Sequence, residues 1–179
     1  VQMQVRYIGG REMGRLFTGY AFTDGSLRRA GHRADARGGW SAVICDSKGE
    51  LLFGTYVPNP HPYPTSFNGE LLAVIQLLQH ATPPLIIYID NQTVIDGWRS
   101  GKAWCTSGER ATADLWRDFW RLLEGLGPGV HLEKCKGHAT EQDVDEGKAT
   151  ARTKKGNNHA DVFACRGTDI AEDISDNSL

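Results

Sequence analysis

The sequence predicts an α/β fold, a mixed five-stranded sheet with helices on both faces. The front of the chain holds three β-prone runs joined by short connections, which is typical of three antiparallel strands. The rest alternates helical patterns with two further strand patterns, which favours a sheet covered on both sides. With 179 residues, 40% of them hydrophobic, the chain is long enough for one domain with a substantial core.

The front strands are expected at residues 20–23, 39–45 and 51–57. Residues 1–19 are expected to be an approach segment with at most one short strand. Residues 27–39 are basic and contain glycine, which predicts a loop. Prolines recur from Pro58 to Pro64 and exclude regular structure there, so this stretch should lead as a loop into the first helix.

The back of the domain should contain, in order, a helix at 69–81, a strand at 85–89, helices at 91–100 and 114–126, a strand at 130–135 and a helix at 160–165. The strand at 85–89 is continuously apolar, as expected of a central strand covered on both faces. Together these elements predict a domain over 20–167, with a long polar loop at 139–156 and a frayed acidic tail at 168–179.

Composition excludes several classes of protein. The net charge of -2 and pI of about 6.3 are not those of a strongly basic nucleic-acid binder, so any basic surface must be local. The four cysteines lack the CxxC spacing of a structural zinc site. No stretch reads as a membrane span or a secretory leader, so we expect an intracellular protein without a membrane partner, with nucleus and cytoplasm not distinguished.

Three carboxylates lie where strands and helices are expected to meet. Asp24 follows a β-prone run and precedes Gly25, a pair that alone favours an ordinary turn. Asp90 ends the most buried strand, and sites in α/β sheets form at such carboxyl ends. If the two strands are adjacent and parallel, Asp24 and Asp90 meet at one edge of the sheet.

Glu70 is expected to begin the first helix on its apolar face and to point toward the sheet. A glutamate there is costly unless it is paired or binds metal, although a first-turn glutamate is also explained by the helix dipole. Converging acids without basic partners repel one another, and a divalent cation resolves that repulsion. Oxygen-only ligands select Mg²⁺ or Mn²⁺, and two such ions can drive hydrolysis of a phosphodiester.

In this order and spacing, the motifs resemble the ribonuclease H family, type 1. The resemblance runs from Tyr20 to about Gly167. The matching segments are 23–26 (TDGS), 38–44 (GGWSAVI), 69–73 (GELLA), 89–94 (IDNQTV), 114–116 (DLW), 136–138 (KGH) and 157–161 (NNHAD).

The resemblance implies a ribonuclease H-like fold and an endonuclease that cuts the RNA strand of RNA–DNA hybrids, leaving 5′-phosphate and 3′-hydroxyl ends. It implies two Mg²⁺ ions, which Mn²⁺ can replace, held by Asp24, Glu70, Asp90 and Asp161. It also implies that His138 assists proton transfer or product release. As substrate-binding residues it suggests Gly25, Ser26, Thr65, Ser66, Asn68, Gln92 and Asn157.

Some of these roles have alternatives. His138 could be a loop histidine without a role, and Asp161 a helix cap. The fourth acid could instead be Asp143, Asp145 or Glu146, which lie closer to the histidine. We prefer Asp161 because Asn157 and an apolar run surround it as in the family.

The sequence departs from the family in two places. The stretch 139–156 is longer than usual and could be a solvated loop, a lid or a clamp with a basic half. The basic protrusion of the family is shortened to Trp98, Arg99, Lys102, Trp104 and Arg110. Reduced domains of this kind resemble those attached to retroelement reverse transcriptases, so such a domain is a candidate partner in a parent polypeptide.

Two other functions remain open. One is a catalytically silent or partner-dependent domain of a larger reverse transcriptase, although the usual mark of a silent copy is the loss of an acid. The other is a transposase, integrase or resolvase of the same fold. Those proteins lack the Lys-Gly-His segment that stands here at 136–138.

Overall fold

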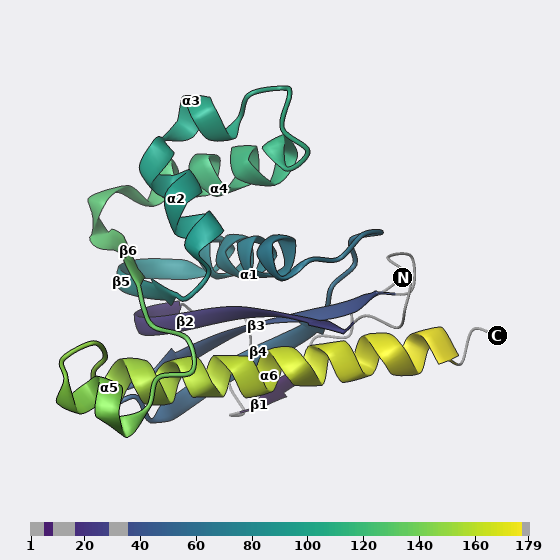
Figure 1. Ribbon diagram of the computed structural model, residues 1–179. Helices are drawn as coiled ribbons and strands as arrows, with labels where there is room; N and C mark the ends of the chain where they lie inside the picture. The colour runs from purple at the N-terminus through teal and green to yellow at the C-terminus, as the bar shows by residue number, and fades with distance from the viewer. Residues whose placement is uncertain (1–5, 9–16, 29–35, 177–179) are drawn as a thin grey trace.

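A computed structural model describes residues 6–8, 17–28 and 36–176 of the chain (Figure 1). Its centre is one sheet with strand order β1-β4-β3-β2-β5-β6. The strands are β1 (Arg6–Ile8), β2 (Phe17–Arg28), β3 (Arg37–Cys45), β4 (Leu51–Pro58), β5 (Ala81–Ile89) and β6 (Val130–Lys134). All five expected strands are present, and β1 adds a short sixth strand at the edge, antiparallel to β4.

The front strands form the expected antiparallel meander, but two of them are longer than predicted. β2 and β3 pair from Tyr20–Cys45 to Arg28–Arg37, so both ends of the segment expected as a loop at 27–39 belong to strands. Pairing between the two backbones extends these strands through polar and glycine residues that carry no strand signal of their own. The rest of that expected loop, residues 29–35, lies outside the described residues.

The parallel half of the sheet brings two acids together. β5 runs parallel to β2, with Thr23 opposite Ile89, and parallel to β6 on its other side. Asp24 and Asp90 are the residues that follow this last pair, so they emerge at the same edge of the sheet. The adjacency on which the sequence argument depended is therefore present.

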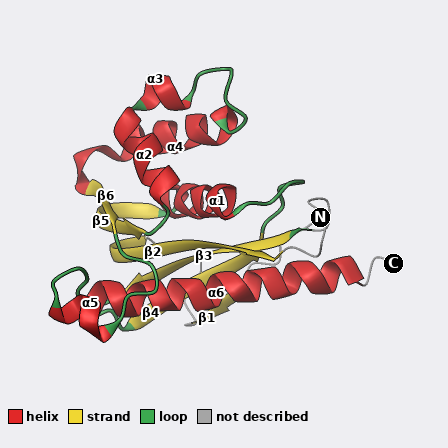
Figure 2. Cartoon of the chain, in the orientation of Figure 1, coloured by secondary structure: helices red, strands yellow, loops and turns green. Residues whose placement is uncertain are grey.

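The helices cover both faces of the sheet, as Figures 1 and 2 show. One face carries α1 (Ser66–Gln79), α2 (Gln92–Ser100), α3 (Lys102–Cys105) and α4 (Ala113–Leu126), and the other carries the long helix α6 (Ala151–Asp176). The short helices α5 (Glu141–Asp145) and η2 (Gly127–Gly129) lie in connections. None of the helices in the described part of the chain is long and apolar enough to cross a membrane.

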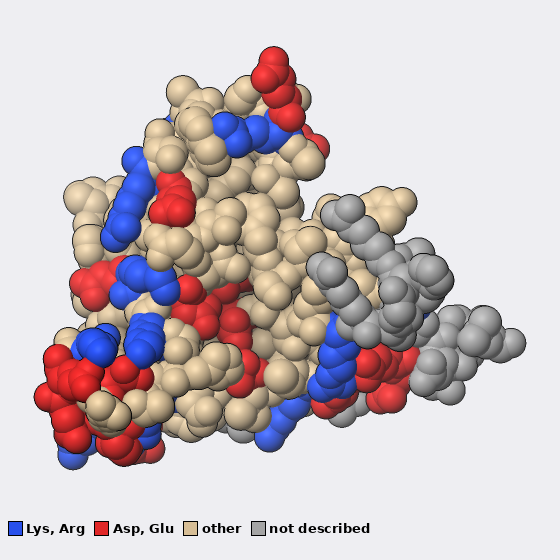
Figure 3. Space-filling view, in the orientation of Figure 1, with Lys and Arg blue, Asp and Glu red and all other residues tan. Residues whose placement is uncertain are grey.

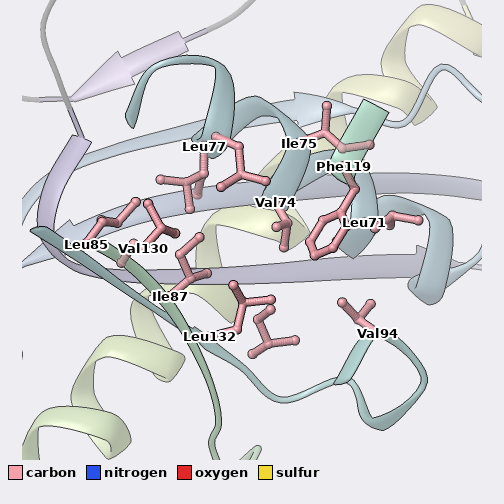
Figure 4. Packing of buried hydrophobic residues seen from close by; sticks show 14 of the residues in the cluster. Leu71, Val74, Ile75, Leu77, Leu85, Ile87, Val94, Phe119, Val130 and Leu132 are labelled. Carbon is pink, nitrogen blue, oxygen red and sulfur yellow. The ribbon is translucent and has the colours of Figure 1, made fainter. Parts of the chain in front are cut away.

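Apolar side chains fill both sides of the sheet. The larger cluster packs α1, α2 and α4 against β2, β5 and β6, and Figure 4 shows Val74 between Ile87 and the Phe119 ring, with Leu71 on the far side of that ring. The smaller cluster lies under α6, where Phe163 meets Phe22 and Val43. The two layers hold the sheet rigid on both sides of the edge from which the acids emerge. The four cysteines are unpaired.

The C-terminal third differs from the prediction. The stretch 139–156, expected to be a loop, contains α5 and the first turns of α6. Residues from Asp169 onward were expected to fray, but α6 continues through them to Asp176. Arg28 of β2 explains part of this extension, because its guanidinium pairs with Asp169 at 2.5 Å and with Glu172 at 2.8 Å.

Candidate active site

Three carboxylates meet at the edge of the sheet. Asp24 comes from β2, Glu70 from α1 and Asp90 from the end of β5. One carboxylate oxygen of each lies within 4.8 Å of the other two, which is close enough for a single cation to contact all three. The structure thus unites the acids that the sequence placed at strand and helix ends.

A close approach between β2 and α1 brings Glu70 to the other acids. A Cβ on Gly25 would lie 2.3 Å from the backbone oxygen of Ser66 and 2.8 Å from the backbone nitrogen of Glu70. Any side chain at position 25 would therefore push the helix away from the strand. The sequence analysis expected Glu70 at the start of the helix. Because α1 begins at Ser66, Glu70 instead lies in its second turn.

Glu70 faces the sheet and is almost completely enclosed, with 1% of its surface exposed. The hydroxyl of Thr23 donates a weak hydrogen bond to its carboxylate at 3.4 Å. No salt bridge to Glu70 is found among the described residues, so the helix dipole alone does not explain a glutamate at this depth.

Burial and mutual repulsion disturb the protonation of all three acids. Burial, followed by the charge of Asp90, raises the pKa of Asp24 to about 8, although the backbone N–H of Gly25 donates to it at 2.8 Å. Burial, and then the charges of Asp90 and Asp24, raises the pKa of Glu70 well above its usual range. Burial also raises the pKa of Asp90, against the opposing effects of Glu70, Lys134 and His138. A carboxylate cluster with so little positive compensation fits a divalent cation.

Two of the candidates for the fourth acid, Asp161 and Asp143, lie in different surroundings. Asp161 of α6 is close enough to contribute to the raised pKa of Asp24, both by its charge and by a hydrogen bond. Asp143 is instead held by Lys136, whose Nζ donates to it at 2.5 Å and lowers its pKa to about 2. Asp161 is therefore beside the cluster, whereas Asp143 serves another purpose.

That purpose is to anchor the loop that carries His138. The Asp143 carboxylate binds Lys136 on one side of the histidine, and on the other side it accepts the backbone N–H of Thr140 at 2.8 Å. Thr140 in turn caps α5. The Thr-x-x-Asp spacing at 140–143 could have revealed this helix start from the sequence.

His138 itself is exposed and has a φ of 50°, an uncommon value outside glycine. The preceding Gly137 passes close to the acids, since a Cβ there would lie 2.8 Å from Asp90 Oδ2. The positive charge of a protonated His138 favours the ionised form of Asp90 and so lowers its pKa. The histidine is therefore beside the cluster without being one of its buried members.

The residues suggested for substrate binding fall into two groups. Ser66 and Gln92 are exposed near the acids, at the first positions of α1 and α2, and Gly25 and Ser26 follow Asp24 on β2. Thr65 and Asn68 form the capping box of α1. The Asn68 amide is buried and bonded to Asn59, Tyr63 and Thr65, so its side chain is committed within the protein.

A cavity of about 280 Å³ opens beside the acids, between the histidine loop and α6. It is lined by His138, Ala139, Lys154, Lys155, Asn157, Asn158 and Asp161. The sequence analysis placed the two lysines in the basic half of the stretch 139–156, for which a clamp was one of three alternatives, but a segment expected as a loop gave them no face and no cavity. In Figure 3, acidic side chains gather near the middle of the face shown, and basic side chains border them on the side of β6 and α5.

Comparison with known proteins identifies relatives. Residues 19–169 match the RNase H family model. A ribonuclease H of Albidiferax ferrireducens is 27% identical over 146 residues, covering 75% of this chain and 85% of that protein. A ribonuclease H of Prochlorococcus marinus is 30% identical over 128 residues, covering 64% of this chain and 75% of that protein.

Solved structures share the fold, as the sequence predicted. The RNase H domain of PFV aligns with a TM-score of 0.62 at 17% identity, covering 85% of this chain and 94% of that one. The protease–reverse transcriptase of prototype foamy virus aligns with a TM-score of 0.64 at 19% identity and covers 93% of this chain. This chain spans only 21% of that protein's length. From the family match over most of its length, the chain belongs to the ribonuclease H family.

Proposed function

We propose that the chain is an endonuclease that hydrolyses the RNA strand of RNA–DNA hybrids and leaves 5′-phosphate and 3′-hydroxyl ends. The observation that carries the proposal is the cluster of Asp24, Glu70 and Asp90, whose carboxylate oxygens lie within 4.8 Å of one another. Membership of the family and the names of the relatives support the same reaction.

The cluster fits two Mg²⁺ ions, with Mn²⁺ as a substitute. Asp24, Glu70, Asp90 and Asp161 would hold them, Asp24 being the acid that borders both Asp90 and Asp161. Bound Mg²⁺ supplies a Lewis acid that activates water and stabilises negative charge on the phosphate. The enclosed position of Glu70 would keep the ligand set fixed while substrate enters and leaves.

Hydrolysis adds water to the scissile phosphorus and breaks the bond to the 3′ oxygen. The phosphate stays on the 5′ end of the downstream fragment, and the departing 3′ oxygen takes a proton. His138 is exposed next to Asp90, where its imidazole can exchange that proton with solvent. The proposed contacts to the hybrid come from β2, the starts of α1 and α2, and α6; they are Gly25, Ser26, Thr65, Ser66, Gln92 and Asn157.

The test is cleavage of an end-labelled RNA–DNA hybrid in Mg²⁺ and in Mn²⁺. We expect the native protein to cut the RNA strand and Asp24→Asn to cut it at least about 100-fold more slowly. Changing a residue that only supports a metal ligand costs at most about 100-fold, so a larger loss indicates a ligand. Asp118→Asn, an exposed aspartate on α4, is the matched control and should cut normally. Intact RNA with native protein in both metals would refute the proposal.

A second candidate is a nuclease that works only as part of a reverse transcriptase. The observation that favours it is the alignment of this chain with a fifth of the foamy virus protease–reverse transcriptase. On this view a neighbouring polymerase domain would supply most of the hybrid binding. Cleavage by the isolated chain at ordinary salt and nanomolar hybrid would exclude such a requirement.

A further inference from the structure

The cavity next to the acids contains mostly groups that bind anions. Two lysines, a histidine and two asparagine amides line it, and the acid among its lining residues is Asp161, which also lies beside Asp24 of the carboxylate cluster. Asp161 and His138 belong to both the cavity and the candidate active site. A nucleic-acid strand whose scissile phosphate lies at the acids would therefore also pass the cavity with a neighbouring phosphate.

We propose that this cavity is a subsite for a backbone phosphate of the cleaved RNA strand, adjacent to the scissile phosphate. The inference rests on the proposed function and identifies Lys154, Lys155 and Asn157 as its donors. Phosphate is the chemistry that suits them, because cationic and amide N–H groups that converge on a hollow recognise tetrahedral oxyanions.

The lysines are held by partners that a phosphate can replace. Lys154 Nζ lies 2.6 Å from Glu141, a carboxylate whose side chain is 81% exposed. Lys155 Nζ lies 2.6 Å from Glu50, which is also exposed. Ion pairs with a solvent-exposed carboxylate are weak, so exchange of either glutamate for a phosphate costs little.

Asn157 provides a second, independent indication. Its side chain is 4% exposed and lines the cavity, yet its only hydrogen bond among the described residues is a long contact of 3.9 Å from the Cys135 thiol to Oδ1. The Nδ2 donors of this buried amide thus have no protein partner in that part of the chain. Nδ2 is not among the side-chain atoms that are sealed from solvent without a partner, so it can donate into the cavity, where a phosphate oxygen would supply the acceptor.

The long histidine loop gives the cavity its fixed wall. Asp143 ties the loop together, because it binds Lys136 and accepts the backbone N–H of Thr140. The same stretch that departs from the family in length thus builds one side of the cavity and brings both lysines to it. The extra residues would then compensate in part for the shortened basic protrusion.

Binding of an uncleaved hybrid tests the proposal apart from catalysis. We would measure the anisotropy of a labelled hybrid in Ca²⁺ with the native protein, Lys154→Gln and Glu141→Gln. Lys154→Gln should raise Kd about 3- to 10-fold and reduce the salt slope by about one contact. Glu141→Gln should lower Kd, because it frees Lys154 for the phosphate and removes a negative charge.

The control is Lys148→Gln, an exposed lysine paired with Glu146 outside the cavity, which should leave Kd unchanged. Changes of the same sign in Lys154→Gln and Glu141→Gln would mean that the pair is only structural, and would overturn the proposal. So would an unchanged Kd in Lys154→Gln. Thermal unfolding of each variant checks that the fold is kept.

A substrate series locates the phosphate. Each hybrid in the series carries one neutral methylphosphonate linkage at a different position of the RNA strand. At one position near the cut, the neutral linkage should weaken binding by the native protein. At that position it should not weaken binding by Lys154→Gln, which has already lost the contact. If no neutral linkage changed the Kd, the cavity would not bind a backbone phosphate of the RNA strand, and the proposal would be refuted even if inorganic phosphate bound there. If the position-dependent loss of affinity were found but the protein did not cleave the hybrid in Mg²⁺, the proposed nuclease function would be contradicted and the phosphate subsite would not. The two proposals can therefore fail separately.

Discussion

At the scale of single residues, the acids are placed by the backbone and not by basic partners. Register sets Asp24 beside Asp90, and Gly25 lets the helix that carries Glu70 come close. Both relations follow from features visible in the sequence: an acid after each of two strands and a glycine at the contact. The depth of Glu70 was visible too, since its own helical face is apolar.

The raised pKa of Asp24 predicts an unusual dependence of stability on pH without metal. An acid whose pKa is about 8 in the folded state and near 4 when unfolded binds more protons when folded. Its contribution to stability is therefore full below about pH 4 and is lost as pH rises toward 8. In EDTA we expect the Tm to fall across this window, and Mg²⁺ to restore it most at the alkaline end.

Differential scanning fluorimetry over pH 4–9, with EDTA or with Mg²⁺, makes this measurement. Asp24→Asn is the control: position 24 then cannot titrate, so the fall in Tm should be smaller, and Glu70 and Asp90, whose pKa values are also raised, account for what remains. A Tm in EDTA that rises steadily from pH 4 to pH 8 for the native protein would contradict the raised pKa.

Glu70→Gln should separate stability from function. Replacement of a desolvated carboxyl beside two other acids by a neutral amide should stabilise the metal-free protein by about 0.5–2 kcal/mol, the usual size of a stabilising substitution. The same change should abolish cleavage and the rise in Tm that Mg²⁺ produces. Urea unfolding in EDTA measures the change in stability, and Glu124→Gln, at an exposed glutamate, is the control. If Glu70→Gln were less stable than the native protein, the Glu70 carboxylate would have a structural role.

At the scale of elements, the sequence predicts strands and amphipathic helices well and predicts polar helices poorly. The strand expected at 39–45 and the helix expected at 114–126 are confirmed within two residues, because their apolar patterns are strong. The first turns of α6 are polar, and Arg152 anchors them, because its Nε donates to the Ser47 carbonyl and its guanidinium lies over the Tyr20 ring. Such contacts join residues far apart in the sequence, and no local pattern reports them.

The tight packing of α6 on the sheet leads to a third prediction. A Cβ on Gly156 would lie 2.2 Å from the Phe22 ring, so Gly156→Ala must push α6 outward. Overpacking of this kind typically costs about 1–3 kcal/mol, and the shift should carry Asp161 away from Asp24 and slow cleavage. Urea unfolding and cleavage rate would be measured on the same variant.

Gly125→Ala is the matched control on α4. A Cβ at this position meets nothing within 4 Å, so the substitution should stabilise the protein by about 0.5–1 kcal/mol through helix propensity and leave cleavage unchanged. Equal effects of the two substitutions would mean that α6 can adjust freely, and that the sheet does not fix Asp161.

At the scale of the whole molecule, the chain has no excess of basic residues, and its basic groups are instead concentrated at particular places. A chain of net charge -2 that handles a polyanion must neutralise the acids with metal and present its basic groups locally. The lysines at the cavity and the few cations near α3 are such groups. The composition predicted that any basic surface must be local, but only the folded chain shows that part of it borders the acids.

A small footprint predicts a shallow response to salt. Proteins that make six to ten phosphate contacts lose about 10³–10⁵ in affinity between 50 and 200 mM salt. We expect this chain to lose less than about 10³ over that range, because it offers fewer cations than such proteins. The measurement is the Kd of a labelled RNA–DNA hybrid in Ca²⁺ at several KCl concentrations, with a DNA duplex of the same sequence alongside. A slope as steep as that of a large basic binder would mean that the binding surface extends well beyond the cavity and the acids.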